Sequence, residues 1–244
     1  LVTGASSGIG RDIARELARR GYNIIAVARN KELLQNLKKE LEQNYKIKVD
    51  IISMDLIDRD GCKKLHKDVK NKYGTIDILV NDAGFGECGY FTQTNLEKEL
   101  GMIDTNIVAL HILTKLFLQD MVEKDMGRIL NVASIAGFMP GPLMATYYST
   151  KAYVVRLTQS IRHELFRKKS NVKISALCPG PVATNFNKVA DSKKVANYAV
   201  KKMLKGRTLI FPSFFIWIAR IMAKILPDQI LAFVCFYAQK RKIQ

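Results

Sequence analysis

The chain has 244 residues, of which 48% are hydrophobic and 25% charged, and its formal net charge is +17. This composition excludes intrinsic disorder, because it supplies enough apolar side chains for a sizeable core. The charge predicts an anionic partner, such as phosphates, acidic substrates, nucleic acid or a lipid surface. The basic excess is C-terminal, since residues 188–244 hold 12 basic residues and two acidic ones.

One domain is expected to span residues 1–244, because the sequence contains no linker rich in Pro, Gly or Ser. Residues 185–244 are expected to form a substrate loop and a C-terminal extension of that domain. The four cysteines lie far apart without histidines at metal-ligand spacing, which predicts a reduced, cytoplasmic protein with no metal site. The opening residues, Leu1 to Gly4, are typical of the end of a buried strand, so we expect further residues before Leu1, with a short targeting segment possible among them.

Short aliphatic and β-branched runs alternate along the chain with longer segments of helical period. In the first helical segment Ile9, Ile13 and Leu17 share one face. The strand-like runs are Asn23–Ala28, Lys48–Met54, Ile76–Val80, Arg128–Val132 and Val172–Cys178. Right-handed crossovers between such runs make the strands parallel and place ligands at their carboxyl ends. The pattern predicts an α/β fold with a doubly wound parallel sheet of the Rossmann type, which alone does not decide function.

A glycine-rich loop, Thr3-Gly4-Ala5-Ser6-Ser7-Gly8-Ile9-Gly10, follows the first strand and opens onto a helix. Free N–H groups at such a helix N-terminus can bind a pyrophosphate. The spacing is G-x-x-x-G-x-G and not the commoner G-x-G-x-x-G, so a tight turn that needs glycine torsions is the alternative. The strand before and the helix after favour nucleotide binding, with contacts from Gly4, Ser6, Ser7, Gly8, Ile9 and Gly10.

The choice of nucleotide depends on the residue after the second strand, about 20 residues beyond the glycines. A side chain at this position contacts the 2'-position of the adenosine ribose. A carboxylate there would bind a free 2'-hydroxyl, but the sequence has Arg29. A guanidinium can form a fork onto a 2'-phosphate. The sequence therefore predicts NADP(H), and the alternative is that Arg29 is only a solvated charge.

Four segments resemble, in order and spacing, the motifs of the short-chain dehydrogenase/reductase family. They are TGASSGIG at residues 3–10, NDAG at 81–84, the serine Ser134, and YYSTK at 147–151. The resemblance covers residues 1–184. It implies a seven-stranded parallel Rossmann sheet and reversible hydride transfer between NAD(P)(H) and a carbonyl or alcohol.

The resemblance also implies where the cofactor binds. The matching positions are Asp55 and Leu56 for adenine, Asn81, Ala83 and Gly84 for support of the nucleotide, and Pro179, Gly180, Val182 and Thr184 for the nicotinamide carboxamide. Asp82 stands where the family more commonly has a second Asn.

Carbonyl reduction needs a proton donor at the oxygen while hydride reaches the carbon. Tyr147 and Lys151 are four residues apart, so on a helix they share one face, about 5–6 Å apart at Cβ. We expect the Lys151 ammonium to lower the pKa of Tyr147, and Ser134 to polarise the carbonyl oxygen. Both Tyr147 and Lys151 are also expected to contact the cofactor.

Two other phenols and one amide are candidates for the same site. Tyr148 and Tyr153 lie within reach of Lys151 by sequence, and the family spacing favours Tyr147 over both. The resemblance gives Asn106 the role of holding a water that relays protons to Lys151. Asn106 among aliphatic residues could equally be a core asparagine that kinks a helix, and the two interpretations are compatible.

The C-terminal extension is unusually apolar. A short strand, Thr208–Phe211, leads into Pro212–Ala219, and a further apolar run covers Ile230–Ala238. The longest uncharged run is 12 residues and is too short to span a bilayer, which takes about 20 residues. Three interpretations remain: a wall of a lipophilic substrate pocket, which we favour, an oligomer interface, or a peripheral membrane anchor.

The leading function is reversible NADP(H)-dependent reduction of a hydrophobic ketone, such as a 3-oxoacyl or steroid-like compound, by a homodimer or homotetramer. The alternative is a nucleotide-sensing or scaffold protein of the same fold without turnover. The presence of Ser134, Tyr147 and Lys151 argues against that alternative. No nucleic-acid-binding motif accompanies the basic charge, so no nucleic-acid partner is expected.

Overall fold

The computed structural model describes residues 1–180 and 191–240. Two of the cofactor contacts expected from the sequence, Val182 and Thr184, lie outside the described residues. Within the described ranges, seven strands form one parallel sheet in the order β3-β2-β1-β4-β5-β6-β7. The strands are β1 (Val2–Thr3), β2 (Ile24–Ala28), β3 (Val49–Ser53), β4 (Ile78–Asn81), β5 (Arg128–Val132), β6 (Lys173–Leu177) and β7 (Leu209–Ile210). The predicted doubly wound Rossmann-type sheet is confirmed.

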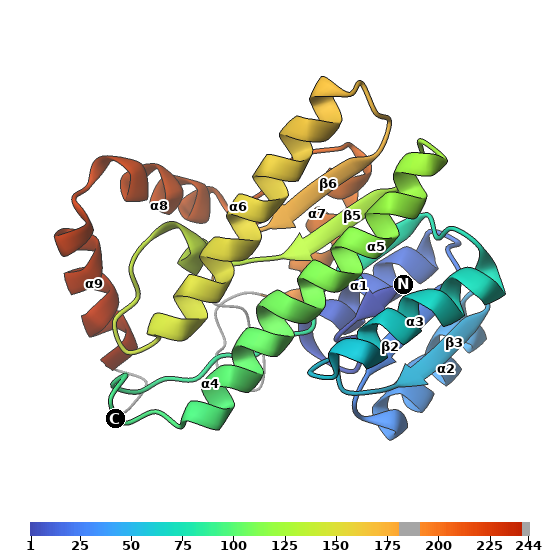
Figure 1. The fold of residues 1–244 in the computed structure, drawn as a ribbon, viewed down its shortest axis with the longest axis horizontal. Coiled ribbons are helices and arrows are strands. Elements are labelled where there is room, and N and C mark those ends of the chain that lie inside the picture. The colour runs from blue at the N-terminus through green and yellow to red at the C-terminus, as the bar shows by residue number, and fades with distance from the viewer. Residues whose placement is uncertain (181–190, 241–244) are drawn as a thin grey trace.

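Helices cover both faces of this sheet (Figure 1). Helices α1 (Gly8–Arg19), α2 (Lys31–Asn44) and α7 (Ser192–Leu204) contribute to one core cluster, with Ile13, Leu34 and Met203 fully buried. Helices α3 (Arg59–Tyr73), α5 (Leu110–Glu123) and α6 (Ala145–Arg167) contribute to the cluster on the opposite face. A short 3-10 segment, η2 (Ile135–Phe138), joins β5 to the loop before α6.

One continuous helical segment consists of α4 (Leu96–Ile103), the π-helical turn η1 (Asp104–Ala109) and α5. By length and composition alone this segment, Leu96–Glu123, could cross a membrane. Its side chains Leu113, Phe117 and Met121 lie in the core against the sheet, and this packing accounts for its apolar character.

The order of the strands fixes where a ligand can bind. β1 pairs with β2 on one side and with β4 on the other, so the connections leave β1 in opposite directions. At such a switch point the loops after the two strands separate and leave a crevice at their carboxyl ends. The glycine-rich loop after β1 and the Asp82–Gly84 turn after β4 therefore meet there.

The C-terminal extension forms two helices, α8 (Phe214–Ile225) and α9 (Asp228–Lys240). Ser213 caps α8, since its hydroxyl accepts from the Phe215 N–H, and Pro227 separates the two helices. Figure 1 shows both helices at the end of the molecule opposite α2 and β3. The predicted strand Thr208–Phe211 is present as the shorter β7.

Candidate active site

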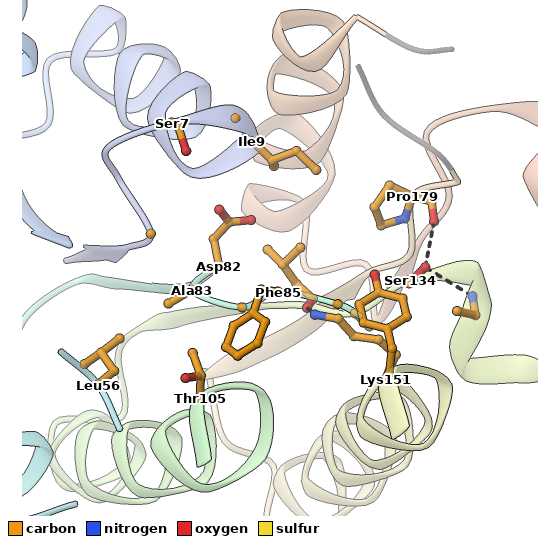
Figure 2. A pocket seen from close by; sticks show the side chains of 18 of the residues that line it. Ser7, Ile9, Leu56, Asp82, Ala83, Phe85, Thr105, Ser134, Lys151 and Pro179 are labelled. Atoms are coloured by element: carbon orange, nitrogen blue, oxygen red, sulfur yellow. Dashed lines mark hydrogen bonds between the residues drawn. The ribbon is translucent and has the colours of Figure 1, made fainter. Parts of the chain in front are cut away.

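An open cleft of about 740 Å³ lies at the carboxyl ends of the strands, and Figure 2 shows part of it. Most of the residues expected from the sequence line this one cleft, although they come from separate loops and from α6. They are Gly4, Ser6, Ser7, Gly8, Ile9, Arg29, Asp55, Leu56, Ala83, Gly84, Ser134, Tyr147, Lys151, Pro179 and Gly180. Gly10, Asn81 and Asn106 are not among the lining residues.

The glycine-rich loop lies directly against the turn that follows β4. Gly4 has a φ of 68°, and a Cβ at Gly4 would be 2.9 Å from the Ala83 nitrogen. A Cβ at Gly10 would be 2.5 Å from the Gly4 carbonyl oxygen, so the loop can pack this closely against α1 only because Gly10 has no side chain. A side chain at either position would push the loop outward, and the turn interpretation and the cofactor interpretation are therefore both compatible with the structure.

The side chain of Asn81 is hydrogen-bonded inside the protein and does not face the cleft. It is buried at the end of β4, and its Nδ2 donates to Asn131 Oδ1 at 2.9 Å and to Thr114 Oγ1 at 3.0 Å. The neighbouring Thr3 hydroxyl accepts from the backbone N–H groups of Asp82 and Ala83 at 3.1 and 3.2 Å. These bonds hold the β4 turn in place, so Asn81 acts through the turn and has no surface in the cleft.

Asp82 brings a half-buried carboxyl group into the cleft, where it lies near the start of α1 (Figure 2). The Gly10 N–H donates to this carboxyl. Burial raises the pKa of Asp82 to about 7, although the nearby Lys151 and the Gly10 bond both favour the charged form. An ionisable group therefore stands where the family more commonly has an amide.

The end of the cleft near β2 and β3 holds the residues expected to bind the adenosine part of the cofactor. The Arg29 side chain is 71% exposed, and its Nη1 lies 3.8 Å from the Asp55 carboxylate. Leu56 is nearly buried and supplies an apolar surface in the cleft. Arg29 is thus loosely held and free to turn toward an anionic ligand.

Ser134, Tyr147 and Lys151 converge at the other end of the cleft. Ser134 follows β5 and caps η2, since its Oγ accepts from the Ala136 N–H at 3.1 Å. The same hydroxyl donates to the Pro179 carbonyl oxygen at 3.4 Å (Figure 2). It is also hydrogen-bonded to Tyr147. The Lys151 Nζ donates to the Val132 carbonyl at 2.9 Å and lies 5.7 Å from the centroid of the Tyr147 ring.

The pKa of Tyr147 is shifted in the opposite direction to the one expected from the sequence. Burial raises the pKa of Tyr147 above its ordinary value, and this effect outweighs the opposing hydrogen bond from Ser134. Burial also lowers the pKa of Lys151 to about 8, an effect that the charge of Asp82 partly offsets. The expected lowering of the pKa of Tyr147 by Lys151 is therefore wrong for the protein without cofactor, because desolvation of the phenol dominates. Tyr147 is held in its protonated form at neutral pH.

Asn106 lies in the π-helical turn η1 and is buried. Its Oδ1 accepts from the Phe85 N–H at 3.1 Å, and its Nδ2 donates to the Phe85 carbonyl at 2.9 Å and to Thr150 Oγ1 at 3.1 Å. A Cβ at Gly84 would be 2.7 Å from Asn106 Oδ1 and 3.6 Å from Lys151 Nζ. The helix is locally altered at this residue, and Asn106 ties the loop after β4 to α6. Its role in a proton relay stays a prediction.

The two rival phenols have other partners. The Tyr148 hydroxyl accepts from Gln239 Nε2 at 2.9 Å and donates to Cys235 Sγ, and burial raises the pKa of Tyr148 to about 12. The Tyr153 hydroxyl bonds to His111 Nδ1 at 2.6 Å, and Tyr153 does not line the cleft.

Gln239 is a residue of the cleft that sequence reasoning missed. It lies in α9, about 90 positions beyond Tyr148, and is only 7% exposed. Its Oε1 is buried without a hydrogen-bond partner among the described residues. A polar residue in an apolar helical run was the available signal, since Gln239 stands four residues after Cys235 and eight after Leu231 on one helical face.

The chain is similar in sequence and in structure to known proteins. A family model described as short chain dehydrogenase matches residues 1–195. An uncharacterised oxidoreductase of Staphylococcus epidermidis is 36% identical over 192 residues, which are 78% of this chain and 80% of that protein. The bulky-bulky ketone specific alcohol dehydrogenase of Comamonas testosteroni has a TM-score of 0.81 and 29% identity, covering 91% of this chain and 90% of that one. A short-chain dehydrogenase of Sphingobium yanoikuyae in complex with NADPH has a TM-score of 0.81 and 28% identity, covering 91% and 92%.

Proposed function

Because this chain belongs to the short-chain dehydrogenase family, we propose that it is an NADP(H)-dependent oxidoreductase that reduces the carbonyl group of a hydrophobic ketone and can run in reverse on the alcohol. One observation carries the proposal: Ser134, Tyr147 and Lys151 meet at one end of a cleft whose other end is formed by the glycine-rich loop and Arg29. A phenol, a hydroxyl and an amine thus share one space with a nucleotide-binding loop.

The residues of the cleft fit a nicotinamide dinucleotide. The loop at the start of α1 presents glycines and small side chains to the cleft, among them Gly4, Ser6, Ser7 and Gly8, so backbone N–H groups there would hold a pyrophosphate. Leu56 and Asp55 would hold the adenine, and Pro179 and Gly180 the carboxamide end. When bound, the nicotinamide supplies or accepts the hydride.

The preference for NADP(H) rests on Arg29. The guanidinium lies at the cleft and is mostly exposed, so it can form charge-assisted bonds to a 2'-phosphate without breaking a buried contact. Asp55 would repel that phosphate if it stayed alone, but it lies 3.8 Å from Arg29, which partly neutralises it. The structural neighbour from Sphingobium yanoikuyae is in complex with NADPH, which supports the same choice.

The chain's own residues supply the proton chemistry. Tyr147, kept protonated by burial, donates its hydroxyl proton to the carbonyl oxygen of the substrate. The Ser134 hydroxyl donates to the Pro179 carbonyl over 3.4 Å, and by turning from this long bond it can donate to the same substrate oxygen. The Lys151 ammonium, anchored to the Val132 carbonyl, favours the phenolate that remains after the proton has left.

The substrate end of the cleft supports a lipophilic ketone. Its lining includes Phe85, Met144 and Tyr148, and the α9 helix closes it through Gln239. The Comamonas testosteroni neighbour is described as specific for bulky-bulky ketones, which favours the same substrate class here. Gln239 Oε1 has no hydrogen-bond partner among the described residues but is buried, so a substrate hydroxyl or amide N–H would reach it only after the Gln239 side chain turns toward the cleft. We therefore expect a bulky ketone that carries one hydrogen-bond donor away from its carbonyl.

The test is NADPH oxidation with matched panels of bulky aliphatic ketones, ketosteroids, 3-oxoacyl thioesters and small ketones. We expect turnover that is highest with the bulky members and lost with Tyr147→Phe. The non-catalytic alternative gives the opposite result: NADPH binds, but no ketone in any panel oxidises it.

A further inference from the structure

Helices α8 and α9 expose a large apolar surface. We call it the C-terminal apolar face, and its exposed residues are Phe214, Phe215, Trp217, Ile218, Met222, Ile225, Ile230, Phe233, Val234 and Tyr237. None of the 12 residues of α8 is buried, although ten of them, all except Arg220 and Lys224, are apolar. Figure 1 shows that both helices lie together at one end of the molecule. Apolar faces of this extent mark a binding surface in a folded protein.

One side of α9 is buried against the body of the protein and the other side is exposed. Leu231, Cys235 and Gln239 recur every four residues and are buried toward the body of the protein. Phe233, Val234 and Tyr237 lie on the outer side, and the Phe233 side chain is 64% exposed. The inner side of α9 is therefore packed against the protein, and no other element among the described residues covers its outer side.

Helix α8 is anchored by a few contacts near its middle. Ile216 lies against Gly180, where a Cβ would be 3.2 Å from the Ile216 Cδ1. The Arg220 guanidinium lies over the rings of Phe138 and Phe211 at 5.6 and 5.7 Å. These contacts fix the orientation of α8, so Phe215, 81% exposed, and Trp217 are held outward.

The charges around this face are almost all positive. Between Phe211 and Lys240 the one acid is Asp228, and the basic residues other than the inward-facing Arg220 are Lys224 and Lys240. The sequence continues with Arg241 and Lys242. Basic side chains that border an exposed aromatic and aliphatic face match the chemistry of an anionic lipid surface. We propose that the C-terminal apolar face docks the protein onto an anionic membrane.

The composition of the face favours lying in the interface over spanning the bilayer. α8 has 12 residues and α9 has 13, whereas a helix needs about 20 to span. Trp217 and Tyr237 are residue types that collect at the boundary between water and lipid. A second copy of this chain is a poorer partner, because a symmetric contact would place the same basic patch, with Lys224 and Lys240, on both sides of the interface.

Trp217 gives a direct test, because it is the one tryptophan of the sequence. The full chain is titrated with vesicles of phosphatidylcholine mixed with phosphatidylserine, and with vesicles of phosphatidylcholine alone. We expect the Trp217 emission to move to shorter wavelength with the anionic vesicles, and brominated lipids to quench it. High salt should weaken binding by screening the lysines.

Variants separate the apolar part from the charged part. Replacement of Phe215 and Phe233 by Ser should weaken vesicle binding by about tenfold or more, since each aromatic side chain loses its burial in lipid. Lys224→Gln with Lys240→Gln should weaken binding to anionic vesicles only. Phe166→Ser is the matched control, because Phe166 is 66% exposed on α6 outside this face, and it should leave binding unchanged.

Unchanged Trp217 emission and no quenching with anionic vesicles would overturn the proposal, whatever the variants do. If the serine variant instead converts a larger species to a smaller one in sedimentation, the face is an interface between copies of the chain. Vesicle binding is measured without substrate or NADPH, so its failure is distinct from a failure of the proposed oxidoreductase activity.

Discussion

At the scale of single residues, the hydroxyl of Tyr147 is the group whose removal should matter most. Tyr147→Phe deletes the proton donor but keeps the ring against Lys151, so NADPH affinity should survive while turnover falls by about a hundredfold or more. Steady-state rates and NADPH titration measure the two effects separately. Tyr148→Phe is the matched control, because Tyr148 bonds to Gln239 and Cys235, and its loss should leave turnover of small ketones nearly unchanged. Equal losses in the two variants would show that the assignment of the acid is wrong.

Asp82 gives a prediction about pH. Its pKa is about 7 in the folded protein and 3.8 ordinarily, so the folded state binds the proton more tightly than the unfolded chain. The stability that this proton supplies is complete below about pH 4 and is lost as the pH rises through 7. Asp82→Asn keeps an acceptor for the Gly10 N–H without the charge. It should raise the free energy of unfolding at pH 8 by at most about 4 kcal/mol, with no gain near pH 4.

Urea denaturation of wild type and Asp82→Asn at several pH values measures this difference. Asp228→Asn, at an exposed acid on α9, serves as the control for a surface carboxyl. A gain from Asp82→Asn that stays the same from pH 4 to pH 8 would show that the Asp82 carboxyl does not titrate differently in the folded protein.

Gln239 should discriminate between substrates. For a bulky ketone with a distant hydroxyl and its deoxy analogue, the wild type should prefer the hydroxylated member, because the Gln239 Oε1, once turned toward the cleft, gains a partner. Gln239→Leu should reduce that preference by about tenfold or more through KM, since a buried unpaired acceptor costs about 1–3 kcal/mol. The ratio of kcat/KM values for the pair is the measurement. A preference that survives in Gln239→Leu would place the substrate elsewhere.

At the scale of elements, the loop after β2 should decide the nucleotide. Replacement of Ala28 by Asp and Arg29 by Ser removes the partner of the 2'-phosphate and adds a repelling carboxylate. Preference should move toward NADH by about ten- to a hundredfold, the equivalent of one charge-assisted bond. Lys31→Ser, at an exposed position on α2, is the control for a nearby loss of charge. A wild type that already uses NADH better than NADPH would make Arg29 a surface charge only.

The sequence predicted the elements better than the contacts between them. The buried strands could be recognised because their apolar runs are local, and five predicted runs match β2, β3, β4, β5 and β6 closely. The cleft residues also followed from position, since loops at the carboxyl ends of parallel strands must meet. The inward placement of Asn81 could not be predicted, because it depends on hydrogen bonds to Thr114 and Asn131 on other elements.

The contact between α9 and Tyr148 could not be predicted from the sequence either. It joins residues that are 91 positions apart, and it depends on how the C-terminal extension folds back over α6. The apolar sequence of that extension predicted a wall of the pocket, an interface or an anchor, and could not say that one helix presents two different sides. The pKa of Tyr147 was predicted in the wrong direction for a similar reason, because burial depends on the whole fold.

At the scale of the whole molecule, the cleft and the C-terminal apolar face are linked through α9, whose inner side reaches the substrate end and whose outer side is exposed. The predicted homodimer or homotetramer stays a prediction, and sedimentation at several protein concentrations would test it. The charge of +17 fits both the nucleotide and the proposed lipid surface, since each is anionic.

The most direct measurement is the transfer of deuterium from NADPH that carries two deuterium atoms at the nicotinamide C4 to a bulky ketone, analysed by mass spectrometry of the alcohol formed. With the wild type we expect one deuterium on the carbinol carbon of the product, and with Tyr147→Phe we expect bound NADPH and almost no labelled alcohol. Bound NADPH with no labelled alcohol from the wild type, across bulky and small ketones alike, would contradict the assignment of this protein as a carbonyl reductase.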